Sequence, residues 1–123
     1  MELGRGGVLK IEGKQGIRLP NTLYIRYPNL RRIEKDGKSQ IVYDSRKGEV
    51  SIWGGTVVEN VIQALARIVV GHQMMKINEV YRVALTVHDA AVIVMPEDEK
   101  DKALEVVTGF MSVPPEWAQG CPV

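Results

Sequence analysis

The sequence has one cysteine, Cys121, and no long apolar run. A single cysteine excludes an intramolecular disulfide and favours a reducing, cytosolic setting. No segment approaches the ~20 apolar residues that a membrane-spanning helix needs, and residues 1–5 lack the apolar stretch of a secretory signal. We therefore expect a cytoplasmic protein without a membrane partner.

Charge of one sign is also lacking. Sixteen basic and fifteen acidic side chains give a net charge of +1, so composition neither implies nor excludes nucleic acid as a partner. The 123 residues, 45% hydrophobic and 25% charged, are those of an ordinary globular protein. We expect one domain over residues 1–123 that is large enough to bury a core.

Residues 1–53 are rich in short strand-like segments separated by turn residues. The clearest turn is Asp36-Gly37, which predicts a hairpin between residues 31–35 and 38–43. A run of four basic residues in this region, either a solvated face or a phosphate contact, consists of Arg26, Arg31, Arg32 and Lys35.

A helix is expected over residues 54–78, which contain no proline and repeat apolar residues with helical spacing. Thr56 and Glu59 have the spacing of a capping box, which predicts the helix start. The broad apolar face predicts a mostly buried helix with a narrow polar strip. That strip consists of Glu59, Asn60, Gln63 and Arg67.

Residues 81–95 predict a β-hairpin, because two β-branched runs flank the polar pair His88-Asp89. A carboxylate between apolar strands must lie at a turn or be bound to something. Strict alternation predicts one strand face shared by Val83, Leu85 and Val87. A second helix is expected over residues 97–112, opened by three acidic residues. The fold class is therefore α+β, with two helices packed on antiparallel β-hairpins.

Three stretches, taken together in their order along the chain, resemble the C-terminal part of the palm of family A DNA polymerases. This is the DNA polymerase I type, and the resemblance is to its bacteriophage members especially. Leu19-Pro20-Asn21 through Tyr27-Pro28-Asn29 is similar to the β-rich segment before the last palm helix. Trp53 to Arg67 resembles the palm helix that faces the primer-template. Leu85-Thr86-Val87-His88-Asp89 resembles motif C, the catalytic hairpin. The ending, residues 111–118, is similar to phage-type termini.

The resemblance implies template-directed nucleotidyl transfer from dNTPs to a DNA primer. Asp89 is then expected to be a ligand of a two-Mg²⁺ site, and His88 to lie beside the primer terminus. Gln63 is expected at the minor-groove side of the duplex, with Asn60 and Arg67 on the same DNA-facing strip. The implied setting is the cytoplasm of a bacterium or a phage-infected host.

The chain departs from the family pattern in two ways. Ala90 stands where the family usually has an acidic residue after the motif C aspartate. The chain also has no counterpart of the motif A aspartate or of the fingers helix. We therefore expect it to be inactive alone and to work with the remaining polymerase segment or a partner chain. A detached palm piece is further expected to expose an apolar face through which two copies associate.

A different class of function remains open at this point. A histidine and an aspartate at a turn are often only a locally satisfied polar pair. The chain is then a non-catalytic remnant that serves as a DNA-binding or protein-interaction module. An unrelated metal hydrolase ranks lower, because the sequence contains only two histidines.

Overall fold

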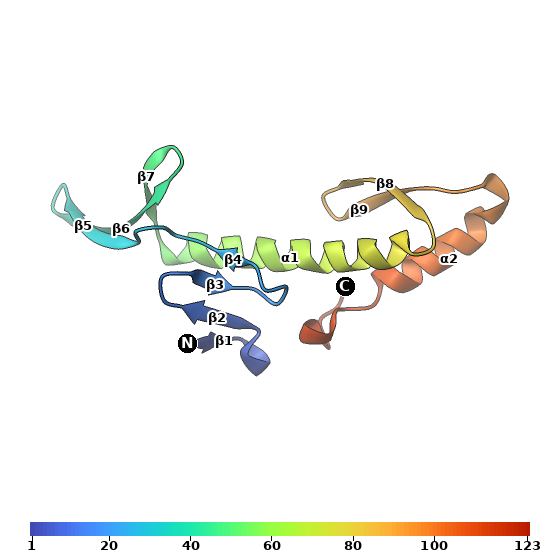
Figure 1. Ribbon diagram of the computed structural model, residues 1–123, viewed down its shortest axis with the longest axis horizontal. Helices are drawn as coiled ribbons and strands as arrows, with labels where there is room; N and C mark the ends of the chain where they lie inside the picture. Colours follow the sequence, from blue (N-terminus) through green and yellow to red (C-terminus); the bar gives the residue numbers. More distant parts are fainter. The chain divides into compact units, whose positions relative to one another are not determined.

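The computed structural model describes residues 1–123 and confirms the α+β class, with antiparallel sheets and two α-helices (Figure 1). The chain divides into two compact units, Met1–Leu65 and Ala66–Val123. That residues 1–123 form a single domain stays a prediction. Neither helix combines the length and the apolar character needed to cross a membrane.

The first unit begins with a four-stranded antiparallel sheet in the order β1-β2-β3-β4. Its strands are β1 (Glu2–Leu3), β2 (Leu9–Glu12), β3 (Gly16–Arg18) and β4 (Tyr24–Ile25), with the 3-10 turn η1 (Arg5–Gly7) between the first two. Glycine is required at position 16, where φ is +116° and a Cβ atom would lie 2.2 Å from the carbonyl oxygen of Ile25.

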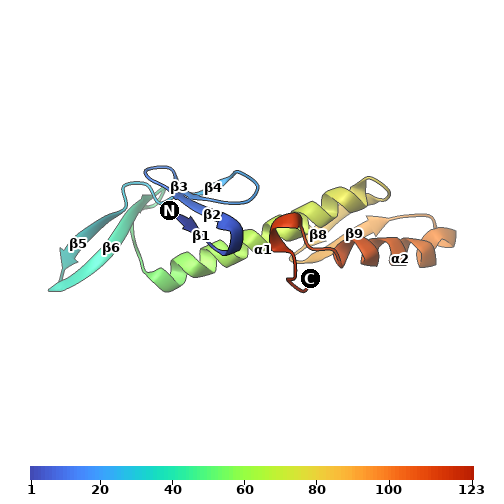
Figure 2. The same cartoon turned by 90° about the horizontal axis from the view of Figure 1, so that it is seen from below.

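A second antiparallel sheet has the order β5-β6-β7, formed by β5 (Arg31–Lys35), β6 (Lys38–Ser45) and β7 (Gly48–Ile52). The hairpin predicted at Asp36-Gly37 is confirmed, with φ of +51° and +70° at its two turn residues. Positive φ at both residues suits the right-handed twist of the strands. The free end of β5 and β6 projects as an arm (Figure 2).

The first helix, α1 (Gly54–Asn78), has the bounds expected from the sequence, but its N-terminal cap differs from the predicted one. The backbone N–H of Val57 donates to the carbonyl of Trp53 at 3.2 Å. Thr56 therefore lies inside the first turn, and the predicted capping box of Thr56 and Glu59 is wrong. Gly54 and Gly55 are themselves helical, so α1 begins two residues before Thr56.

The expectation that α1 is mostly buried is also wrong. Only Val61, Gln73 and Ile77 of its residues are buried. Val58 and Ile62, which belong to the predicted apolar face, are 62% and 58% exposed. The apolar stripe is wider than the surface that the other elements of this chain cover.

The second unit contains the end of α1, a hairpin and a second helix (Figure 1). Its elements are β8 (Arg82–Val87), β9 (Ala90–Val94), the 3-10 turn η2 (Glu97–Glu99), α2 (Lys100–Met111) and the 3-10 turn η3 (Glu116–Ala118). Its core is formed by Ile77, Tyr81 and Ala103, against which apolar side chains of β8, β9 and α2 pack. The helix expected over residues 97–112 therefore starts as a 3-10 turn and becomes α-helical at Lys100.

A β-bulge interrupts β8 between Val83 and Leu85. Val83 pairs with Ile93, and Leu85 pairs with the next residue back, Val92, so Ala84 has no partner. The predicted common face of Val83, Leu85 and Val87 is wrong for this reason. Val83 packs against the core of the second unit, whereas Leu85 and Val87 are about half exposed, at 52% and 53%.

Candidate functional site

His88 and Asp89 form the two-residue turn of the β8–β9 hairpin, since Val87 pairs with Ala90. Both side chains are exposed. Neither forms a hydrogen bond or an ion pair within the chain. The turn thus presents an unpartnered carboxylate and an unpartnered imidazole to the surroundings.

The backbone of His88 is left-handed, with φ of +54°. Histidine is among the few non-glycine residues enriched in this region, but glycine or asparagine is the usual choice in a two-residue turn. Strained φ values of this kind cluster at functional sites. The two-residue turn itself requires positive φ at its first position, so the unusual feature is that a histidine occupies it.

The donor set at the tip is incomplete for a metal ion. Mg²⁺ prefers hard oxygen ligands such as the Asp89 carboxylate. However, the chain nowhere brings together three or more His, Cys, Asp or Glu side chains in a metal-binding group. These residues alone therefore do not make a Mg²⁺ site.

Three residues of the polar strip expected on α1 are exposed: Glu59, Gln63 and Arg67. Gln63 donates a hydrogen bond from Nε2 to Oε1 of Glu59, one turn away, at 3.2 Å. Arg67 lies one turn further on, is exposed and forms no ion pair. Gln63 and Arg67 therefore follow each other at i, i+4 spacing on one side of the helix.

Asn60, the third residue assigned to this strip, is engaged elsewhere. Its Nδ2 donates to the hydroxyl of Tyr27 at 3.1 Å, in a partly buried contact. The Tyr27 ring meets that of Tyr43 edge to face, with 5.2 Å between centroids. Asn60 thus links α1 to the segment after β4 and to β6.

Two polar residues that sequence reasoning did not single out hold the hairpin and α2 to α1 within the second unit. Gln73 is 5% exposed, and its Nε2 donates to the carbonyl oxygen of Met111 at 2.7 Å. The side chain of Asn78 accepts a hydrogen bond from the backbone N–H of Val83 at 3.2 Å. The only available signal was the position of Gln73 among apolar residues of the helix.

The first unit also contains an open groove of about 810 Å³. It is lined by parts of β2, β3, β6 and β7, by the loop after β4 and by the start of α1. Trp53 lines it and is 71% exposed, with its indole lying against Gly55, where a Cβ atom would come within 2.1 Å of the ring.

No family model matches the chain, and no solved structure is similar to it. The chain is 31% identical over 115 residues to a DNA polymerase of Bacillus phage SP02, and the match covers 87% of this chain. It spans only 17% of the length of that relative. The chain is therefore similar to one part of a phage DNA polymerase.

Proposed function

We propose that the chain is a segment of a DNA polymerase, and that this segment is the C-terminal part of a family A palm. The observation that carries the proposal is the similarity to a phage DNA polymerase over 115 residues. A match that covers most of this chain but 17% of the relative is what a segment of a larger enzyme gives. The exposed His88-Asp89 tip supports the finer assignment to a motif C hairpin.

Asp89 is assigned one carboxylate ligand of the Mg²⁺ site, and His88 a position beside the primer terminus. Both roles need accessible side chains without partners in the chain, and both side chains meet that condition. Because three ligands gather nowhere in this chain, the proposal places the remaining metal ligands on the missing polymerase segment. Catalysis then depends on association with that segment or with a partner chain.

Gln63 and Arg67 are assigned contacts with the primer-template. The Gln63 amide is exposed and bonded to Glu59 on its own helix, and its oxygen and second N–H suit the minor groove. Arg67 is an unpaired cation that suits phosphate. Asn60 already donates to Tyr27. Its contribution to DNA binding is therefore to hold α1 in place rather than to read the duplex.

The test is Mg²⁺-dependent primer extension by the full chain, alone and mixed with the remaining segment of a phage polymerase. We expect no extension by the chain alone and extension in the mixture. Asp89→Asn should reduce that extension by at least a hundredfold, because an amide is a poor Mg²⁺ ligand. Asp98→Asn is the matched control, since Asp98 is also an exposed carboxylate of the second unit without an ion pair or a hydrogen bond. Equal activity of the two variants would remove Asp89 from the metal site.

A second candidate is a non-catalytic DNA-binding module. The absence of any three-ligand group and the presence of Ala90 after Asp89 favour it. Titration with duplex DNA at two salt concentrations distinguishes the two functions, because phosphate contacts weaken as salt rises. Salt-dependent binding without extension in the mixture supports the second candidate.

A further inference from the structure

Two lysines face each other across the tip of the β5–β6 arm. Lys35 and Lys38 are directly opposite in the strand register, on either side of the Asp36-Gly37 turn. Residues directly opposite in an antiparallel pair have Cα atoms about 4.5–5.5 Å apart and project to the same face of the sheet. Both lysines are exposed, so two ammonium groups are presented together at the end of the arm.

This arrangement is unfavourable for the isolated hairpin, because like charges directly opposite destabilise a strand pair. Neither lysine forms an ion pair, not even with Asp36 in the turn between them. Glu34 gives no relief on that face, because it is opposite Ser39 and alternates to the other side of the strand.

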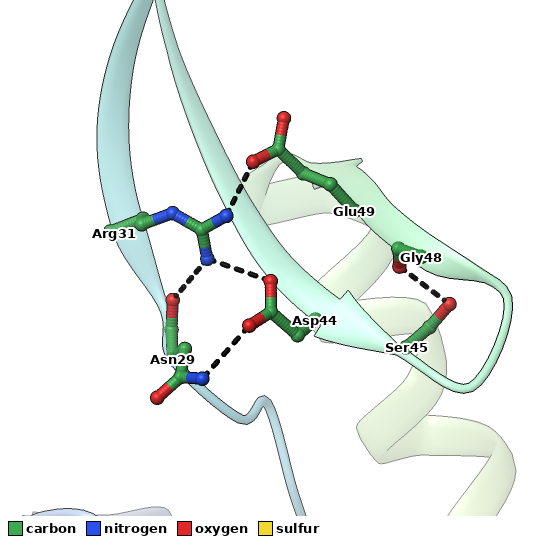
Figure 3. A network of polar contacts seen from close by, with 6 residues as sticks. All are labelled: Asn29, Arg31, Asp44, Ser45, Gly48 and Glu49. Atoms are coloured by element: carbon green, nitrogen blue, oxygen red, sulfur yellow. Dashed lines mark hydrogen bonds and ion pairs between the residues drawn. The ribbon is translucent and has the colours of Figure 1, made fainter.

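Three other basic residues of the first unit are paired with carboxylates. Arg31 in the same strand donates to the carboxylates of Asp44 and Glu49 (Figure 3), and the Asp44 contact is 2.8 Å long. Lys10 pairs with Glu2 at 2.9 Å and Arg18 with Glu12 at 3.6 Å. The basic run of the sequence is thus divided: Arg31 belongs to a neutralised network, whereas Arg26, Arg32 and Lys35 form no ion pair. Of these three, Lys35 alone has a second basic side chain, Lys38, directly opposite it in the strand register.

The charge of the first unit favours a polyanion as the partner. Residues 1–65 carry eleven basic and seven acidic side chains, a net charge of +4, whereas residues 66–123 carry five and eight, a net charge of −3. A near-neutral chain therefore contains one basic unit. Such local excess attracts phosphate independently of the total charge.

We propose that the tip of the β5–β6 arm binds the phosphate backbone of duplex DNA through Lys35 and Lys38. Lysine acts as a point charge toward phosphate, so the contact positions the duplex and does not read its sequence. A DNA strand carries one charge about every 3.4 Å along the axis, which supplies anions to both ammonium groups. The inference rests on the proposed function insofar as that function makes DNA the ligand.

The test is the affinity of the full chain for a labelled duplex of random sequence, measured by fluorescence anisotropy at about 50 mM and about 200 mM salt. K35E/K38E should weaken binding at the lower salt at least tenfold. It should also reduce the slope of log affinity against log salt by about 1.8, the value for two lost phosphate contacts. K35R/K38R should bind as the unchanged chain does. K35E/K38E should fold as stably as the unchanged chain, because two opposite glutamates repel each other as the two lysines do. A thermal melt of both proteins measures this.

K100E/K102E is the matched control, with the same change in net charge on two exposed lysines of α2. Its affinity should stay within threefold of the unchanged chain. Equal loss in both double variants would show an effect of net charge alone and overturn the proposal. Unchanged binding by K35E/K38E would also overturn it, leaving the lysines as protection of the exposed strand edge, while the polymerase assignment stands. Primer extension that does not depend on Lys35 and Lys38 would also overturn the lysine proposal and leave the polymerase assignment standing. If the unchanged chain does not bind the duplex, the proposed DNA contact is overturned as well.

Discussion

The side-chain amide of Gln73 donates a hydrogen bond to the main-chain carbonyl of Met111 at 2.7 Å, although 37 residues separate them along the intervening chain. The bond joins α1 to the last residue of α2 and satisfies one of the carbonyls that a helix end leaves without a partner. Because Gln73 is buried, water cannot replace it. This polar contact therefore supports the part of the fold on which the β8–β9 hairpin is mounted.

Gln73→Ala should lower the free energy of unfolding by about 1–3 kcal/mol, because the Met111 carbonyl loses its donor in a buried setting. Gln63→Ala is the control on the same helix, where the exposed pair with Glu59 is expected to contribute less than about 0.5 kcal/mol. Urea unfolding followed by circular dichroism measures both. Equal values for the two variants would contradict a structural role for the Gln73 bond.

Ile77→Ala should lower the free energy of unfolding by about 2–5 kcal/mol, the range for truncating a large side chain in a packed core. Ile77 is 1% exposed and belongs to the core cluster with Tyr81 and Ala103. Ile62→Ala, at a position that is 58% exposed on the same helix, should cost much less. The midpoint and slope of urea unfolding give the free energy of unfolding of both variants. An equal loss of stability in Ile62→Ala and Ile77→Ala would contradict the assignment of the core.

Two substitutions of His88 distinguish its effect on stability from its effect on primer extension. His88→Val should lower the free energy of unfolding by about 1–2 kcal/mol, because a β-branched residue resists the left-handed conformation. His88→Gly should fold at least as stably as the unchanged chain, since φ of +54° costs glycine nothing. Under the proposed function, both variants should lose primer extension in the complemented mixture. Full activity of His88→Gly would reduce the histidine to a turn residue.

Acid should weaken the polar network around Arg31 (Figure 3). The pKa of the Asp44 carboxyl lies below its ordinary value of 3.8, because Asn29 donates a hydrogen bond to it and Arg31 lies beside it. A carboxyl whose pKa is lowered by folding adds stability above its unfolded pKa and loses it as pH falls through the folded pKa. We expect stability to fall below pH 3.8 less steeply in Asp44→Asn than in the unchanged chain. Unfolding midpoints between about pH 5 and pH 2 measure the difference; identical profiles would contradict it.

The parts of the fold that local signals determine were predictable. Asp36-Gly37 is a strong turn signal, and its hairpin has the expected register. The unbroken helical period without proline gave the bounds of α1. By contrast, β1 contains only two residues, which is too short for any periodicity to be recognised.

The errors share a physical cause, namely contacts between residues far apart in sequence. Nothing in the residues around Asn60 indicates that its amide meets Tyr27, 33 positions earlier. The exposure of Val58 and Ile62 depends on which surfaces other elements reach, not on the helix itself. The tip location of His88 and Asp89 was predictable because it depends only on two flanking strands. Their roles at a metal or a primer stay predictions.

The unpaired Ala84 divides β8 into a part before the bulge, Arg82 and Val83, and a part after it, Leu85 to Val87. Val83 packs against the core of the second unit, whereas Leu85 to Val87 lie on the turn side of the bulge. Removing Ala84 would restore a regular ladder while every other side chain kept its side of the sheet, and only the added local twist would disappear. A one-residue deletion there would therefore rotate His88 and Asp89 relative to the core of the second unit and leave the strand pairing of the hairpin intact. The bulge thus sets the direction in which these two side chains point.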